Sequence, residues 1–198
     1  MKNLNPKRIA NILALTPVQE GMLFHYLQDT QSELYFEQLS LEIYGKIDAR
    51  HFENAWNAVI ETNEMLRVMF RWEEIENPVQ LVLKKHKLQP RYTDLSGVDA
   101  QQKIERLEEI TRKDAQEKFD LNEVPLRVTL CKIEEDKYVI IISNHHILYD
   151  GWSTGVILKE FFLAYHESLH NGRVFKFSAK PPFKEYIRWV QSQDRNKQ

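Results

Sequence analysis

Apolar residues recur at helical spacing in several stretches of the chain, and the first stretch begins at residue 16. Thr16 suits a helix N-cap, Pro17 suits the first helical position, and Gln19 completes a capping box. The apolar positions that follow predict a helix of about three turns. Residues 1–14 precede this signal, and we expect them to form a leader or linker.

The same spacing predicts four further helices. Asp48 caps the second, whose apolar residues form one stripe. Residues 99–118 are rich in charged side chains with a thin apolar line, which is typical of a surface helix with a solvated face. The last two helices run from Ser153 to about His170 and onward from Pro182.

Alternating apolar and polar residues predict the strands. Residues 35–44 and Met65–Trp72 each alternate, Val79–Leu83 is a shorter apolar run, and Leu126–Ile133 is followed by Tyr138–Ser143 across a charged turn. The last two form a hairpin, and the continuous apolar run after the turn indicates a central strand. We therefore expect an α/β fold of the two-layer α+β kind, with a mixed sheet packed against helices.

Composition narrows the class of protein. The 198 residues are 42% hydrophobic and 28% charged with a net charge of -2, which favours a globular domain and excludes a strongly basic nucleic-acid surface. The single cysteine, Cys131, cannot form an internal disulfide, which fits a reducing compartment. No apolar run approaches the roughly 18 residues of a membrane span, and we expect a cytoplasmic protein.

The stretch His145–Ser153 carries the most informative chemistry, because two histidines follow a buried strand and an acid and a glycine follow them. A histidine with a pKa near about 6.5 can accept a proton from an amine at neutral pH. Asp150 can orient an imidazole or pair with a cation, and Gly151 allows a sharp bend and a close approach of its N–H. A histidine at a strand end is also commonly structural, so the spacing alone leaves both interpretations open.

The motif His-His-x-x-x-Asp-Gly at His145–Gly151 resembles the signature of the condensation-domain superfamily, which includes chloramphenicol acetyltransferase-like enzymes. Leu15–His25 resembles the family's first motif, Asn63–Phe70 the second and Pro182–Trp189 the fourth. Asn63 stands where the family usually has histidine. The resemblance covers only the amino-terminal of two lobes, so we expect residues 15–198 to be that lobe of a condensation domain from a nonribosomal peptide synthetase, without the carboxy-terminal lobe.

The resemblance implies that His146 is the catalytic residue, as a general base on the acceptor amine or as the group that positions it. His145 would be structural. Asp150 would pair with Arg67 in a buried ion pair, Gly151 would present its N–H to the substrate, and Ser153 would cap the following helix.

The implied reaction is attack of an acceptor aminoacyl amine on a donor thioester, both held on phosphopantetheine arms of carrier proteins. The chain itself would then need no metal or nucleotide. Its partners would be carrier-protein domains and the missing lobe, and the exposed lobe-facing surface is compatible with a homodimer. We expect the isolated lobe to be inactive.

Three alternatives remain at the level of sequence. His166 to His170 fits the zinc-protease pattern His-Glu-x-x-His, although no later histidine supplies a third ligand. The chain could instead be a non-catalytic docking fragment for carrier proteins. Within the superfamily, the paired histidines argue against heterocyclisation domains, and the first motif favours joining of L-configured residues over epimerisation.

Overall fold

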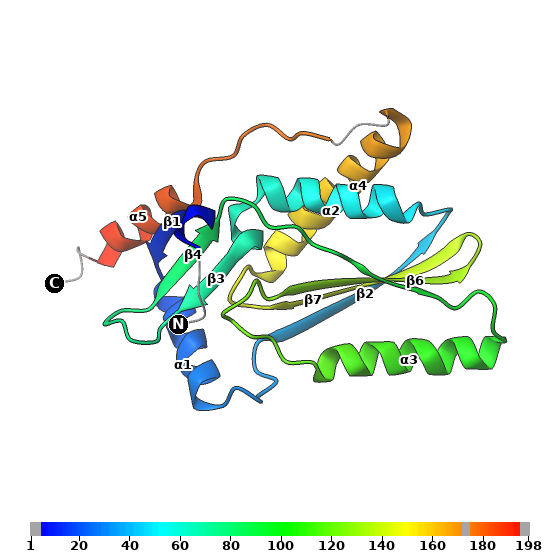
Figure 1. The fold of residues 1–198 in the computed structure, drawn as a ribbon, viewed down its shortest axis with the longest axis horizontal. Coiled ribbons are helices and arrows are strands. Elements are labelled where there is room, and N and C mark those ends of the chain that lie inside the picture. The colour runs from blue at the N-terminus through cyan, green and yellow to red at the C-terminus, as the bar shows by residue number, and fades with distance from the viewer. Residues whose placement is uncertain (1–4, 172–174, 195–198) are drawn as a thin grey trace.

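The computed structural model describes residues 5–171 and 175–194, and within these ranges the chain forms five α-helices and seven strands in two sheets (Figure 1). The predicted combination of helices with a mixed sheet is confirmed. The strands divide into a four-stranded sheet and a separate three-stranded sheet, a division that the sequence did not indicate.

The larger sheet has four strands in the order β2-β7-β6-β5. Its strands are β2 (Phe36–Tyr44), β7 (Lys137–His145), β6 (Leu126–Glu134) and β5 (Arg91–Asp94). Neighbours pair antiparallel except β5 and β6, which are parallel. The predicted hairpin and the central position of its second strand are confirmed, whereas β5 was not predicted, because its short run of mainly exposed polar residues lacks an apolar pattern.

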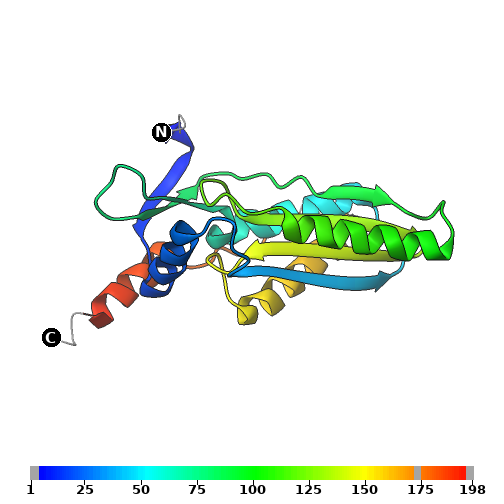
Figure 2. The same ribbon diagram turned by 90° about the horizontal axis from the view of Figure 1, so that it is seen from below.

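Helices cover both faces of this sheet (Figures 1 and 2). One face carries α2 (Ala49–Thr62) and α4 (Gly151–Asn171), and the other carries α3 (Ala100–Gln116). The rings of Phe52 and Trp56 on α2 lie 5.2 and 4.9 Å from that of Phe161 on α4, so these two helices share the main core. The N-cap predicted at Asp48 is confirmed by its bond from the His51 N–H.

The smaller sheet lies at one end of the molecule, in the order β1-β4-β3. Its antiparallel strands are β1 (Ile9–Ala14), β4 (Val79–Leu83) and β3 (Val68–Arg71). Residues 9–14 are therefore part of the fold and not a leader, since they pair with β4 as the edge strand of this sheet. The strand expected from residue 65 begins only at Val68, because Glu64–Arg67 form a 3₁₀ turn, η2.

Two helices flank the small sheet, α1 (Pro17–Gln28) and α5 (Phe183–Asp194). The predicted capping box of α1 is present, with Thr16 Oγ1 accepting from the Gln19 N–H at 3.2 Å and Gln19 Oε1 accepting from the Thr16 N–H at 2.9 Å. A short 3₁₀ turn, η1 (Pro6–Arg8), precedes β1.

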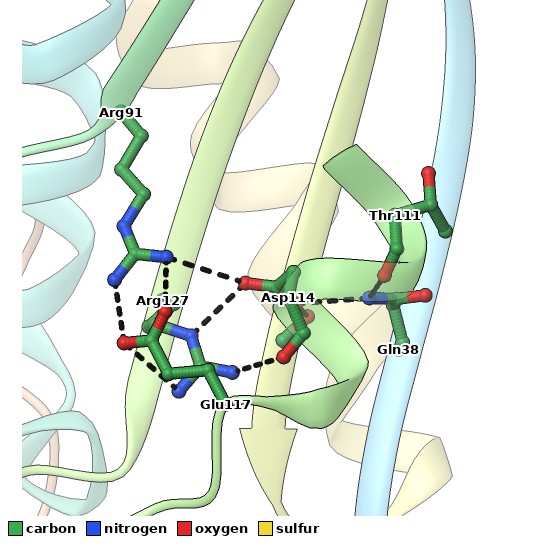
Figure 3. Close-up of polar contacts among 7 residues, drawn as sticks. Gln38, Arg91, Thr111, Asp114, Glu117 and Arg127 are labelled. Carbon is green, nitrogen blue, oxygen red and sulfur yellow. Dashed lines mark hydrogen bonds and ion pairs between the residues drawn. The ribbon is translucent and has the colours of Figure 1, made fainter. Parts of the chain in front are cut away.

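Asp114 attaches α3 to the large sheet through a buried polar cluster (Figure 3). Its carboxylate accepts hydrogen bonds from Arg127 Nε at 3.0 Å, from Gln38 Nε2 at 2.9 Å and from the hydroxyl of Ser143. Burial alone would raise the pKa of Asp114, but these hydrogen bonds outweigh burial and the pKa is lowered. The charged helix is thus mainly solvated, as predicted, with one buried carboxylate that the sequence pattern did not reveal.

Candidate active site

The two adjacent histidines stand at the end of β7 and line different cavities. His145 is the last residue of the strand, and His146 begins the turn that leads to α4. His145 lines a small pocket with Tyr26 and His25, whereas His146 lines a larger cavity. Successive side chains of a strand point to opposite faces, which explains why neighbours in sequence reach different surroundings.

His145 is buried and held in one tautomer. Its Nδ1 accepts a hydrogen bond from the Ile147 N–H at 3.1 Å, so the ring hydrogen must lie on Nε2. The rings of Tyr26 and Tyr35 pack around it. Burial, followed by the neighbouring His146, lowers its pKa from 6.5 to about 4. A neutral, enclosed imidazole of this kind shapes the turn.

His146 is the more accessible of the two, with 31% of its side chain exposed. Its backbone N–H donates to the carbonyl oxygen of Tyr35 at 2.8 Å. Tyr35 has a φ of 65°, a left-handed conformation that is costly for a residue with a side chain and that its surroundings maintain. This hydrogen bond holds the backbone of His146 against that of Tyr35.

Glu37 is the residue that the sequence did not indicate. Its Oε1 lies 2.8 Å from His146 Nδ1, but this contact does not meet hydrogen-bond geometry, and the buried Nδ1 has no hydrogen-bond partner among the described residues. Its Oε2 accepts from Asn144 Nδ2 at 3.1 Å, and Asn144 Oδ1 accepts from the hydroxyl of Tyr149 at 2.8 Å. Glu37 lies opposite Asn144 in the β2–β7 ladder, a long-range pairing that a single sequence does not show.

The cavity beside His146 has a volume of about 640 Å³. Its walls come from the start of α1, the turn after β7 and the segment that enters α5, and they include Met22, Tyr149, Pro182 and Tyr186. Such a mainly apolar cavity with few polar groups suits an organic substrate.

Gln19 ties α1 to the turn after β7. Its Nε2 donates to the Ile147 carbonyl oxygen at 3.1 Å and to Gln80 Oε1 at 3.2 Å. Gln80 Nε2 in turn donates to Gln19 Oε1 at 3.0 Å. The buried amide pair thus joins the first motif, the histidine turn and the small sheet.

Asp150 does not pair with Arg67, contrary to the prediction. Its exposed carboxylate accepts the N–H and the hydroxyl of Ser153, each at 2.9 Å, and these bonds lower its pKa. Arg67 instead donates from Nε to the Leu83 carbonyl oxygen at 3.1 Å and lies 3.7 Å from Glu64. Capping of the helix satisfies the carboxylate locally, and no hydrogen bond or ion pair joins these two described side chains.

The mainly buried Arg67 lies against a second cavity of about 440 Å³, formed by η2 and the chain around Lys180. Burial lowers its pKa, while Glu64 and Glu61 oppose this effect. Arg67 therefore supports the second motif and not the histidine turn.

Ser153 differs from its expected role, and the predicted role of the Gly151 N–H stays a prediction. Ser153 is a hydrogen-bond donor to the capping residue, Asp150, and is not itself the cap. Gly151 is the first residue of α4, its φ is not in the left-handed region, and a Cβ built on it would meet no atom within 4 Å. The missing side chain therefore leaves open space at the Cβ position and does not serve a left-handed bend.

The second and fourth motifs contact each other. Lys180 Nζ donates to Asn63 Oδ1 at 2.7 Å and pairs with Glu160, which also accepts from Asn63 Nδ2 at 2.7 Å. Glu64 Oε2 accepts from the Phe183 N–H at 2.8 Å. Asn63 thus fills a structural position between helices, which explains how an amide can stand at this site.

The zinc-protease pattern lies at the exposed end of α4. The rings of His166 and His170 stack with their centres 4.1 Å apart, and His170 Nδ1 lies 2.8 Å from the His166 carbonyl oxygen. Across residues 5–171 and 175–194, no group of three histidine, cysteine or acidic residues is arranged to hold a metal ion. None of the helices in the same ranges is both long and apolar enough to cross a membrane.

Comparison with known sequences identifies relatives over nearly the whole chain. The profile of the family described as Condensation domain matches residues 9–198. Surfactin synthase subunit 2 of Bacillus subtilis (strain 168) is 35% identical over 192 residues, which are 96% of this chain and 5% of that protein. Bacitracin synthase 3 of Bacillus licheniformis is 36% identical over 188 residues, 94% of this chain and 3% of that protein. The chain thus spans a small part of these relatives.

Solved structures share the fold. The starter condensation domain of rhizomide synthetase RzmA superimposes with a TM-score of 0.75 at 18% identity, over 94% of this chain and 45% of that one. The first condensation domain of the CDA synthetase gives 0.78 at 18% identity, over 93% and 46%. The chain corresponds to slightly less than half of each.

Proposed function

The chain belongs to the condensation-domain family of nonribosomal peptide synthetases, and from this premise we propose that it supplies the histidine-bearing half of a peptide-bond-forming active site. The observation that carries the proposal is the His146 side chain, partly exposed in a cavity of about 640 Å³ at the end of a rigid central strand. A proton acceptor held at such a position can act on a substrate in the cavity.

In the proposed reaction, the nitrogen of an acceptor aminoacyl group attacks the carbonyl carbon of a donor thioester. A C–N bond forms and the C–S bond breaks. His146 takes the proton that the amine loses, and this proton passes to the departing thiolate. Because the thioester is already activated, the chain's contribution is positioning and proton handling.

The supporting residues keep His146 in place. His145 shapes the turn as a neutral, buried ring, and Asp150 with Ser153 caps α4 immediately beyond it. Gly151 has open space where a Cβ would stand, and its N–H is proposed to face a substrate group. Arg67, which bonds the Leu83 carbonyl oxygen, is proposed to stabilise the second motif.

Carrier-protein domains that present their substrates on phosphopantetheine arms are the proposed partners. A carboxy-terminal lobe is the second proposed partner. The chain covers 45% of the RzmA starter condensation domain, and a second lobe would close the cavity beside His146. The isolated chain is therefore proposed to be inactive. Joining of L-configured residues remains the preferred subtype. A second copy of the chain, bound through the exposed lobe-facing surface, is a further proposed partner.

The test is to combine the chain with a carboxy-terminal lobe and to assay dipeptide formation between two loaded carrier proteins. His146→Ala should lower the rate by about a hundredfold or more, the usual contribution of a general base. His170→Ala is the matched control, since that exposed ring lies at the far end of α4, and it should leave the rate unchanged.

Equal rates for wild type and His146→Ala would contradict the proposed role of this ring. Dipeptide formation by the chain alone would contradict the proposed inactivity of the isolated lobe. Carrier-protein binding with no condensation, even with the second lobe present, would favour the docking fragment.

A further inference from the structure

We infer that Glu37 is the positioning residue of His146, which it holds in the tautomer whose Nε2 is free to accept a proton. This inference rests on the proposed function of His146 but concerns the state of the ring before any substrate is present. Glu37 lies on β2, and the strand pairing, not proximity in sequence, brings it to the histidine turn.

We infer a hydrogen between the two atoms from their separation, although the contact does not have hydrogen-bond geometry in the structure. Glu37 Oε1 and His146 Nδ1 are 2.8 Å apart. A carboxylate only accepts hydrogen bonds, so a lone pair on Nδ1 at this separation would face a negatively charged oxygen. A hydrogen on Nδ1 removes that repulsion. The neutral ring then carries its lone pair on Nε2.

Glu37 is itself oriented from the opposite side. Asn144 Nδ2 donates to its Oε2, and the Tyr149 hydroxyl donates to Asn144 Oδ1. Asn144 is therefore fixed with its amide nitrogen toward the carboxylate. The negative charge of Glu37 also raises the pKa of the buried Tyr149, after the larger effect of burial, which keeps that hydroxyl a donor.

The two histidines are thus set in opposite tautomers by different partners. A backbone N–H places the hydrogen of His145 on Nε2, whereas a carboxylate places that of His146 on Nδ1. A second group that orients the base is a recurrent device in acyl-transfer sites, because a wrong tautomer cannot take the proton. His145 provides an internal reference, since its tautomer should not depend on Glu37.

The test uses the full 198-residue chain labelled with ¹⁵N-histidine, with tautomers read from two-bond ¹H–¹⁵N correlations at a pH where the rings are neutral. His146 is assigned by its loss in His146→Ala. Wild type should show hydrogen on Nδ1 of His146. Glu37→Gln, whose amide can donate to Nδ1, should convert at least half of the ring to the Nε2–H form, while Glu37→Asp should retain the wild-type form.

Glu42→Gln is the matched control on the same strand, because Glu42 pairs with Lys137 at the surface, and it should change nothing at His146. An unchanged His146 tautomer in Glu37→Gln, or an Nε2–H ring in wild type, would overturn the inference.

A second measurement separates this inference from the proposed function. With the carboxy-terminal lobe and loaded carriers, Glu37→Gln should lower kcat roughly tenfold to a hundredfold with little change in KM, which is no more than the loss expected for removal of the general base itself. A tautomer change with an unchanged kcat would leave the positioning by Glu37 supported and would count against His146 as the base.

Discussion

Asp150 accepts two hydrogen bonds from Ser153, one from its backbone N–H and one from its hydroxyl, each at 2.9 Å. The acid of the histidine motif is therefore a helix cap on the surface and not half of a buried ion pair. This geometry changes what its removal should cost, because an exposed cap contributes much less than a buried charge pair.

We expect Asp150→Ala to lower the free energy of unfolding by about 1 kcal/mol, the usual value for a lost N-cap. Asp150→Asn keeps a capping oxygen and should change the free energy of unfolding by only about a few tenths of a kcal/mol. Urea unfolding of the three proteins measures the difference. If Asp150→Ala lost about 3 kcal/mol or more, the result would support a buried ion pair between Asp150 and Arg67 and would contradict the capping role.

The buried His145 should make the fold sensitive to acid. Because its pKa is lowered from 6.5 to about 4, the unfolded chain binds its proton first. Its contribution to stability is complete above pH 6.5 and is lost as the pH falls from 6.5 through 4. The loss is on the order of 3 kcal/mol, at about 1.4 kcal/mol for each pH unit.

Urea unfolding at several pH values between about 7 and 4 would measure this slope, and His145→Gln, whose amide oxygen can accept the Ile147 N–H, should flatten it. Burial also lowers the pKa of His86, so part of the slope should remain. The exposed His170 is the control, and His170→Gln should leave the slope intact. An identical slope in His145→Gln would contradict the assigned burial.

The cluster around Asp114 allows two arginines to be compared on one carboxylate. Arg127, 12% exposed, bonds Asp114 at 3.0 Å, whereas Arg91, 50% exposed, lies 3.8 Å away. Arg127→Met leaves a buried carboxylate without its main partner and should cost about 3 kcal/mol or more. Arg91→Met should cost less than about 1 kcal/mol, because water screens its pairs.

Thermal or urea unfolding compares these two variants directly. Equal losses of unfolding free energy in Arg127→Met and Arg91→Met would mean that the stabilisation of Asp114 does not depend on how deeply its arginine partner is buried. Acid should also weaken the cluster, since the lowered pKa of Asp114 means that its contribution is present above the ordinary value near 3.8 and is lost below it.

Gly151→Ala should separate folding from activity. Since the added Cβ meets no protein atom and φ is not in the left-handed region, we expect the free energy of unfolding to stay the same or to rise by up to about 1 kcal/mol. If a substrate group approaches the Gly151 N–H, dipeptide formation should fall several-fold. Equal activity together with unchanged stability would remove Gly151 from the site.

Much of the secondary structure follows from local pattern. The capping box at Thr16 and Gln19, the cap at Asp48 and the hairpin of β6 and β7 were predicted correctly, because each depends on residues that are neighbours in the chain. Strands β1 and β5 were not predicted, since each becomes a strand only by pairing with a distant partner. Local propensity carries little information about such pairing.

The sequence by itself determined the family and the histidine turn, since the four motifs and the run before His145 can be read residue by residue. Only the tertiary structure decided which side chains contact the residues of that turn. Strand register places Glu37 beside His146, and local capping assigns Asp150 to Ser153 instead of Arg67. The physical reason is that a side chain's partner depends on which backbone segments lie together, and one sequence does not specify those distances.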